Sequence, residues 1–475
     1  MKKGTVAFLV LFISSSLFLS AGPERWEFTL SPYGGYPAYG QAVPSSDGKG
    51  PRKKPLLAAL EVFVINAGVW AYDRYALNKD YSHISWKTWK ANLKSHWIWD
   101  SDSLGTGFFG HPYQGSMYFQ SARSLGMTFW ESIPYAAGGY LMWGYFMEND
   151  PPSYNDLIMT TLGGVGLGEV KYRLSAKLLE GLSDGGGGAW RRILAFALAP
   201  ISNLNRWIRG GEARFSPGGG GPGPDVHGEL SFGGSMISPK GNLAGAKFSP
   251  GVSYDIAYGV GRSEIRSGRP FELFFLNGEV RYAQKTAFLD IGTYGLLAGA
   301  EIGSSGPSRS VIGLFQNYDY FKSETMYLSG VALSAGLVSL FPLGRRSELI
   351  TSLQLGFVPL GAARNPYLGV GDRDFNYDWG GMGKAEIWLR HLPIGSISVK
   401  AGRYQLYTID AAAPVGTDKG HDFWTYVKAD YRLPLAEHLG LRFDYGLYRL
   451  HQEFRIHPPA KTRLSRVGAA LDVSF

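Results

Sequence analysis

The chain has 475 residues, a formal net charge of +8 and no cysteine, which excludes disulfide bonds and thiolate metal sites. Glycine (65 residues) and aromatic residues (14%) are abundant, yet the mean hydropathy is only −0.10, too low for a protein built of membrane-spanning helices. A transmembrane β-barrel has this kind of composition, because only alternate residues of its strands face lipid. The sequence contains no basic cluster or nucleic-acid motif, so we expect no nucleic-acid partner.

The first residues have the features of a secretory signal peptide. Lys2 and Lys3 precede an apolar run over residues 6–19, and small residues follow it. We therefore predict a signal peptide at residues 1–21, since the apolar run is too short to favour an uncleaved anchor. Residues 22–54 are rich in Gly, Pro, Ser and Tyr, which predicts a flexible, extended arm.

Residues 55–210 carry helical patterns and predict an all-α periplasmic domain. The run 56–72 is apolar but contains Glu61. A carboxylate at a bilayer centre costs roughly 2.5 kcal/mol or more, so we interpret this run as a core helix and not as a membrane span. The run HPYQGSMYFQSARSLG, from His111 onwards, predicts the next long helix.

Two capping boxes predict the starts of two further helices. Thr128 is followed three residues later by Glu131, and Ser153 by Asp156. The second of these helices runs to about residue 180 and contains four glycines, at positions 163, 164, 166 and 168. Each glycine costs about 1 kcal/mol against alanine in a helix, so we expect close helix–helix packing to offset that cost. The small residues 136–139 of the preceding helix suit the same contact.

Two parts of this region resemble a known family. They are HPYQGSMYFQSARSLGMTFWES and MWGYFMENDPPSYNDLIMTTLGGVGLGE. Over residues 56–182 the chain resembles the domain-of-unknown-function family 3943 of bacterial envelope proteins. The resemblance implies an exported protein and carries no activity, cofactor or substrate with it.

The end of the helical region allows two interpretations. Residues 190–208 have an apolar middle flanked by arginines. This amphipathic segment either lies on the inner leaflet of the outer membrane or closes the periplasmic core. Residues 211–225 are rich in Gly and Pro and predict a linker.

Residues 226–475 predict an antiparallel transmembrane β-barrel of about 12 strands. The overall fold class is therefore α+β and multidomain. We place the strands at residues 227–235, 249–258, 271–283, 287–301, 309–318, 326–341, 347–360, 377–391, 395–408, 421–434, 438–452 and 463–475. The last strand alternates apolar and small or polar residues up to the final Phe475. That ending resembles the terminal strand of bacterial outer-membrane barrels, which the barrel-assembly machinery reads, so we expect this machinery and outer-membrane lipids as partners.

Loop lengths agree with this register except near the first strands. With the amino end in the periplasm, connections after odd strands should be long and those after even strands short. The connection after strand two is long and that after strand three is short. The assignments of the first strands therefore do not follow this rule. A soluble β-sandwich is the competing fold, but its edges would be left open.

Four residues of the helical region are candidates for catalysis: His111, Glu131, Asp156 and Glu169. An imidazole with carboxylates suits a hydrolase or a metal site, but no HExxH, GxSxG or His-x-His spacing is present. The structural alternative is that Glu131 and Asp156 cap helices. Glu169 falls on the apolar face of its helix and would then form a buried ion pair with Arg173 or a residue of another helix.

A second candidate site lies between strands of the barrel. Asp372, Asp374, Asn376 and Asp378 alternate as in the first half of a calcium-binding loop, but the glycine and closing glutamate of that loop are missing. A solvated acidic loop is the alternative. We expect no cofactor.

The lumen-facing positions mix both signs of charge, at Lys384, Glu386, Arg390, Lys400, Lys428, Asp430, Arg432, Arg442 and Asp444. In a narrow bore such charges can pair and fill it. The leading hypothesis is thus a non-enzymatic outer-membrane barrel whose helical domain plugs it, contacts the inner leaflet or binds an envelope partner. The alternatives are an envelope lipid or cell-wall hydrolase that uses His111, and a narrow solute channel.

Overall fold

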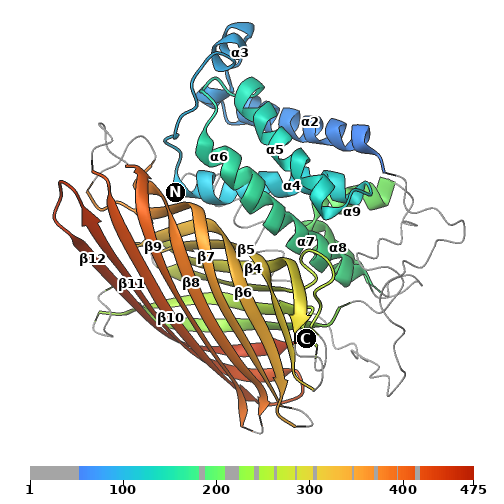
Figure 1. The fold of residues 1–475 in the computed structure, drawn as a ribbon, viewed down its shortest axis with the longest axis vertical. Helices are drawn as coiled ribbons and strands as arrows, with labels where there is room; N and C mark the ends of the chain where they lie inside the picture. The colour runs from blue at the N-terminus through green and yellow to red at the C-terminus, as the bar shows by residue number, and fades with distance from the viewer. Residues whose placement is uncertain are drawn as a thin grey trace, which may run out of the picture.

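A computed structural model describes residues 53–180, 188–208, 224–239, 245–261, 265–283, 286–302, 307–344, 347–367, 373–392, 394–411 and 418–475. The predicted signal peptide therefore lies outside the described residues, as do nearly all of the predicted arm and linker. The described chain forms a helical region followed by a barrel (Figure 1). Its α-helices are α2 Pro55–Ala71, α3 Trp86–Asn92, α4 His111–Ser124, α5 Phe129–Phe146, α6 Tyr154–Ile158, α7 Gly164–Leu179, α8 Ala189–Leu198 and α9 Pro200–Ile208.

Twelve antiparallel strands close into a barrel in chain order, with β1 paired to β12. This confirms the predicted fold class and strand number. The strands are β1 Val226–Ser238, β2 Lys247–Tyr258, β3 Phe274–Ala283, β4 Thr286–Ile302, β5 Arg309–Lys322, β6 Tyr327–Pro342, β7 Glu348–Arg364, β8 Phe375–Leu392, β9 Gly395–Asp410, β10 Gly420–Pro434, β11 Leu439–Phe454 and β12 Ala460–Ser474. The backbone of Phe475 exchanges two hydrogen bonds of 2.9 Å with Gly228, which completes the closure.

We call the end where β1 begins the turn end and the opposite end the loop end. The alternation of side chains is the same all around the barrel. Asp255 and Asp290 face the lumen, and so do the residues paired with them in the neighbouring strands. The residues that alternate with these along each strand face outward. On β7 to β12 the outward side chains are largely apolar and exposed, among them Leu353, Leu355, Phe357, Ile387, Val427, Phe443, Tyr445, Val467 and Leu471.

The helical region packs against the outer wall of the barrel and not inside it (Figure 1). Phe108 and Phe109 contact outward side chains near the loop end, such as Tyr320 and Tyr377. Nearer the turn end, Phe129 stacks on Phe271 at 5.8 Å. Of the three alternatives for the helical region, the plug is therefore excluded, because the bore is filled by the barrel's own side chains, as described below.

Glycines do allow close helix–helix packing, but the partner differs from the predicted one. A Cβ on Gly164 would lie 2.7 Å from the backbone of Gly115 in α4, and a Cβ on Gly115 would lie 1.9 Å from the carbonyl oxygen of Thr160. The small residues of α5 pack instead on α4, where Gly139 faces the ring of Tyr118. Gly166 faces Gln316 of β5, so the same glycine run also brings α7 close to the barrel.

Three helix predictions need correction. The capping box at Thr128 forms, but the Ser153 side chain makes no cap hydrogen bond, and a π-turn at Met159–Gly163 interrupts the helix that follows. Residues 190–208 form two helices, because Pro200 cannot continue the first. Finally, α2 is not a core helix, since Leu56 is 86% exposed and Phe63 is 48% exposed.

The connection 259–273 explains why the loop-length rule fails after β2. Its described parts, residues 259–261 and 265–273, lie at the turn end, and the second of them docks the helices to the barrel. Its Phe271 stacks on Phe129, and the carbonyl oxygen of Pro270 accepts a 2.7 Å hydrogen bond from Arg173 of α7. The strand assignments therefore stand, and the long connection has a packing role.

Candidate functional site

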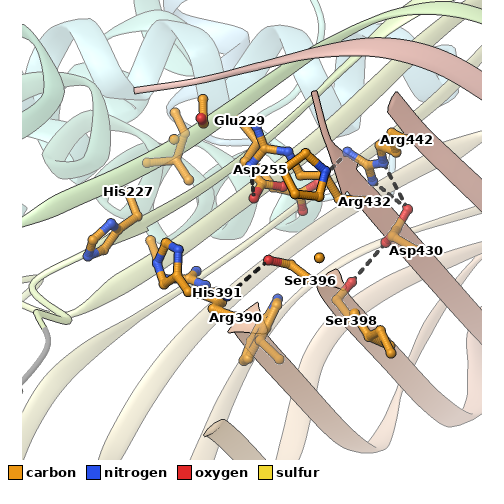
Figure 2. Close-up of a pocket in the computed structure, with 18 of the residues that line it drawn as sticks. His227, Glu229, Asp255, Arg390, His391, Ser396, Ser398, Asp430, Arg432 and Arg442 are labelled. Atoms are coloured by element: carbon orange, nitrogen blue, oxygen red, sulfur yellow. Dashed lines mark hydrogen bonds and ion pairs between the residues drawn. The ribbon is translucent and has the colours of Figure 1, made fainter. Parts of the chain in front are cut away.

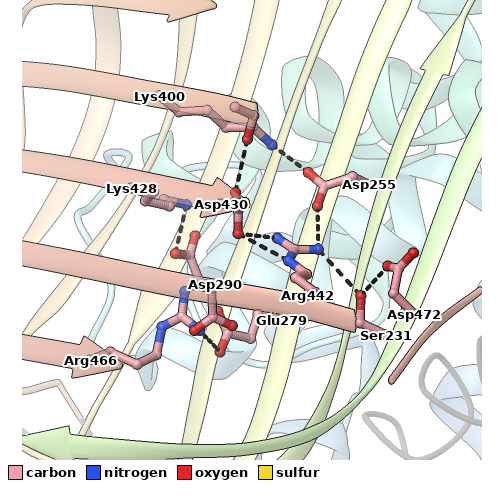
Figure 3. Close-up of polar contacts among 12 residues, drawn as sticks. Ser231, Asp255, Glu279, Asp290, Lys400, Lys428, Asp430, Arg442, Arg466 and Asp472 are labelled. Carbon is pink, nitrogen blue, oxygen red and sulfur yellow. Dashed lines mark hydrogen bonds and ion pairs between the residues drawn. The ribbon is translucent and has the colours of Figure 1, made fainter. Parts of the chain in front are cut away.

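The middle of the lumen is occupied by ion pairs, several of which join strands that are not neighbours (Figure 3). Arg442 of β11 donates to Asp430 at 2.6 and 3.0 Å and to Asp255 of β2 at 2.8 Å. Lys428 lies 2.7 Å from Asp290 across the bore. Further pairs join Lys400 to Asp255, Lys384 to Asp319, Arg281 to Glu279 and Asp444, Arg466 to Glu279 and Asp444, and Arg432 to Glu229 and Asp472. The predicted pairing of lumen charges is confirmed.

Aromatic and aliphatic side chains fill the lumen on both sides of these ion pairs. Toward the loop end, Phe321 packs on Tyr448 at 4.7 Å and on Trp424 at 5.5 Å. Toward the turn end, Phe275 stacks on Trp388 at 4.9 Å. The pocket among the charges between them has a volume of about 20 Å³. Within the described residues, this packing leaves little room for water along the bore.

A cavity of about 250 Å³ remains at the turn end of the lumen (Figure 2). Several of its charged side chains have partners in the protein. Arg432 donates to Glu229 at 2.7 Å, and Asp430 accepts from Ser398 at 2.9 Å. Arg390 lies 3.7 Å from Glu348. The cavity is below the usual size of a ligand pocket, and its charges favour the closed network over a bound solute.

The structure brings two of the four catalytic candidates together, at the loop end of the helical region. Nε2 of His111 lies 3.1 Å from Asp156 and 3.7 Å from Asp102, and Nδ1 lies 3.5 Å from the hydroxyl of Thr160. The hydroxyl of Thr160, the imidazole of His111 and the carboxylate of Asp156 are thus arranged in the order of a catalytic triad for acyl transfer. However, Thr160 is 1% exposed and His111 is 7% exposed, so packed side chains bar a substrate from this arrangement.

The surroundings of this cluster are acidic. Burial and the neighbouring Asp100, Asp102 and Glu148 raise the pKa of Asp156 well above its ordinary value. Burial opposes ionisation of Asp100 as well, but hydrogen bonds from Tyr377 (2.7 Å) and Asn155 (2.6 Å) hold its pKa below the ordinary value. Through its hydrogen bonds with Asn155 and Tyr377, Asp100 also ties the helices to β8.

The other two candidates lie elsewhere. Glu131 is exposed, completes the capping box with Thr128 and pairs with Lys53 at 2.7 Å. Glu169 is fully buried and pairs with Arg123 and Arg173. The expected ion pair with Arg173 is confirmed, and Arg123 is the residue from another helix.

The described residues of the predicted calcium-binding segment, Asp374, Asn376 and Asp378, do not form a cation site together. Asp372 lies outside the described residues. Asn376 and Asp378 are buried on the lumen side of β8, whereas Asp374 is only half-buried, beside Arg364. Within the described residues, no group of three or more His, Cys, Asp or Glu side chains is arranged to hold a metal ion.

Sequence reasoning missed the partners of both clusters. Thr160 lies 49 residues after His111, whereas Asp100 and Asp102 lie in the segment just before it, and packing brings these side chains together. Asp255 and Asp290 occupy the polar positions of alternating strands, which is a signal that could have found them.

Comparison with solved structures finds outer-membrane channels. A deletion mutant of the TodX monoaromatic hydrocarbon channel has 10% sequence identity and a TM-score of 0.22, covering 54% of this chain and 91% of that one. The anion-selective porin from Comamonas acidovorans has 8% identity and a TM-score of 0.20, with coverages of 53% and 99%. The P. putida toluene transporter TodX has 9% identity and a TM-score of 0.20, with coverages of 54% and 90%.

Sequence identities and TM-scores this low do not indicate a shared function. No curated protein sequence matches the chain. Residues 96–201, which include the His111 cluster and Glu169, match the family described as Domain of unknown function (DUF3943).

Proposed function

We propose that this protein is a non-conducting outer-membrane protein whose sealed barrel anchors the helical region for a structural or binding role. The observation that carries this proposal is the filled lumen, in which ion pairs are enclosed by packed aromatic side chains. The apolar, exposed outer wall of β7 to β12 supports placement in a membrane, because a closed barrel with a polar interior suits lipid on its outside. Outer-membrane lipids and the assembly machinery that reads the strand ending in Phe475 are the partners we propose.

The sealed lumen predicts that the purified protein does not conduct ions. In planar lipid bilayers we expect no single-channel steps, whereas an open porin in the same bilayers gives them. Heat-modifiable gel mobility checks that the inserted barrel is folded. Stepwise conductance from a heat-modifiable sample would refute the sealed barrel and favour the narrow solute channel.

The helical region has an apolar outer surface at the level of the barrel wall. Within the described part of the chain, Pro55–Ala76 has the length and composition of a membrane span. The 17 residues of α2 are about 25 Å long, which matches the apolar band of a barrel. Except for Arg192 of α8, its large exposed side chains and those of α8 and α9 are apolar: Leu56, Leu60, Phe63, Val64, Ile193, Phe196, Trp207 and Ile208.

Several charged residues of this region lie at its two ends or inside the bundle, although Glu61 of α2 is half-buried and Arg192 of α8 is exposed. Asp100 lies at the loop end beside Tyr377, and Lys53 and Glu131 lie at the other end. Buried Glu169 faces arginines within the bundle, as polar residues in membrane bundles do. We infer that the helices lie beside the barrel at the level of the bilayer, in contrast to the periplasmic placement expected from the sequence.

Single cysteines test this placement cleanly, because the chain has none of its own. With a membrane-impermeant maleimide we expect Lys87→Cys at the loop end to react in intact cells. Lys177→Cys at the turn end should react only after the outer membrane is permeabilised. Phe63→Cys on α2 should react only in detergent.

A periplasmic helical region gives a different pattern. Lys87→Cys and Phe63→Cys would then both react after permeabilisation, and neither would react in intact cells. That result would leave the sealed barrel standing and would return the helices to the periplasm.

A further inference from the structure

Cations form a row on the outward face of the barrel, and the outward residues between this row and the turn end are largely apolar. Arg403, Arg449 and Arg463 lie on β9, β11 and β12, and all three are exposed. Thr425 of β10 pairs with Arg403 on one side and with Arg449 on the other, and Arg449 pairs with Arg463. The three arginines and Thr425 therefore lie at the same height on four neighbouring strands.

This arrangement is unfavourable without an anion. Arg449 and Arg463 are direct cross-strand partners, and like charges in that position repel. In the described part of this wall, the carboxylate of Glu453 lies 3.3 Å from His451. No carboxylate of the described residues pairs with Arg449, Arg463 or the adjacent Lys461. A surface groove of about 420 Å³ is lined by four cations, Arg403, Arg449, Lys461 and Arg463, together with Phe423.

The height of the row matches the edge of a bilayer. The outward residues of β11 between the turn end and Arg449 are Leu439, Leu441, Phe443, Tyr445 and Leu447. Ten residues of strand span about 33 Å, or about 25 Å along the axis of a barrel whose strands tilt by about 40°. That is the height of the apolar band, so the cations lie where phosphates of the adjoining leaflet would be.

We propose that the outer wall of β9 to β12 binds a lipid that carries phosphate monoester groups, with its acyl chains against the apolar strip below. The doubly charged phosphate takes the place of the missing carboxylate between Arg449, Arg463 and Lys461, and Arg guanidinium groups donate to phosphate oxygens in pairs. This inference rests on the proposed membrane location and adds a ligand class to it.

The test uses the detergent-purified full chain and native mass spectrometry with three probes: phosphatidic acid, phosphatidylcholine and inorganic phosphate. We expect the wild type to prefer phosphatidic acid. The variant Arg449→Gln/Lys461→Gln/Arg463→Gln should bind it about 100-fold more weakly, on the order of a fivefold loss for each cation near a lipid surface. The matched control Lys419→Gln/Arg455→Gln removes two exposed cations of nearby loops and should bind as the wild type does.

Three results would overturn the proposal: equal binding by wild type and triple variant, an equal loss in the control, or equal occupancy by inorganic phosphate. The triple variant should keep its heat-modifiable mobility, since it removes a repulsion; if it does not fold, Arg463→Gln alone should show the fivefold loss. A chain that stays soluble without detergent would instead refute the membrane location itself.

Discussion

Replacing Glu169 with alanine is expected to lower the free energy of unfolding of the helical region by about 3–5 kcal/mol, because it leaves two buried guanidinium groups without their carboxylate. Oε2 and Oε1 of Glu169 accept from Arg123 at 2.7 and 2.9 Å, and Oε1 also accepts from Arg173 at 2.8 Å. Arg173 in turn donates to the carbonyl oxygen of Pro270, so the loss should also loosen the contact with the barrel. Urea titration with pulse proteolysis of the full chain in detergent measures the change.

The control for this experiment is Glu131→Gln, which removes a carboxylate of the same region from an exposed helix cap. Its effect should be much smaller, since water solvates Lys53 once the pair is broken. Replacing Glu169, Arg123 and Arg173 together by apolar residues of similar size should recover much of the lost stability. Equal effects of Glu169→Ala and Glu131→Gln would contradict the buried ion pair.

The barrel could be predicted from the sequence because its signal is local. Alternation with a period of two places every second residue on the outside, so strands such as β11 and β12 are visible in the sequence without knowledge of their neighbours. The lumen charges follow from the same alternation. The prediction that they pair across the bore needed only the small diameter of a barrel with this number of strands.

The placement of the helical region could not be predicted, because it depends on contacts between distant segments. The outward side of β5 carries Gln316, Tyr318 and Tyr320 where other strands carry exposed apolar residues, and Gly166 of α7 fits against it. A polar or tyrosine-rich outward face is a weak signal that helices and not lipid cover a wall. The exposure of α2 could not be predicted either. A run of apolar residues predicts burial, but it does not tell whether protein or lipid covers the helix.

For the candidate site, the sequence contained the residue types but not their geometry. His111 and Asp156 meet only because Gly115 and Gly164 let α4 and α7 approach, and that approach buries Thr160. The same packing that creates the hydroxyl–imidazole–carboxylate order thus closes it to a substrate. Its geometry therefore favours a structural role, and the lumen and the outer wall are the places where function should be tested.

Arg442→Ala is expected to destabilise the barrel by about 3–5 kcal/mol, because it leaves two lumen carboxylates without their shared cation. Arg442 is 7% exposed and joins Asp430 of its neighbour strand to Asp255 on the other side of the bore. After its removal Asp255 keeps its ion pair with Lys400, whereas Asp430 loses its ion pair and keeps the hydrogen bond from Ser398. The temperature at which the folded band is lost in a heat-modifiability gel should fall accordingly.

The matched control is Arg463→Ala, which removes the same side chain from the next strand. Arg463 points outward, away from the lumen network, and stands opposite another arginine. Its loss should leave the transition temperature unchanged or raise it in the absence of anionic lipid. If instead both variants lowered that temperature equally, the lumen pairs would contribute nothing specific to stability, and the sealed bore would have to depend on its aromatic layers alone.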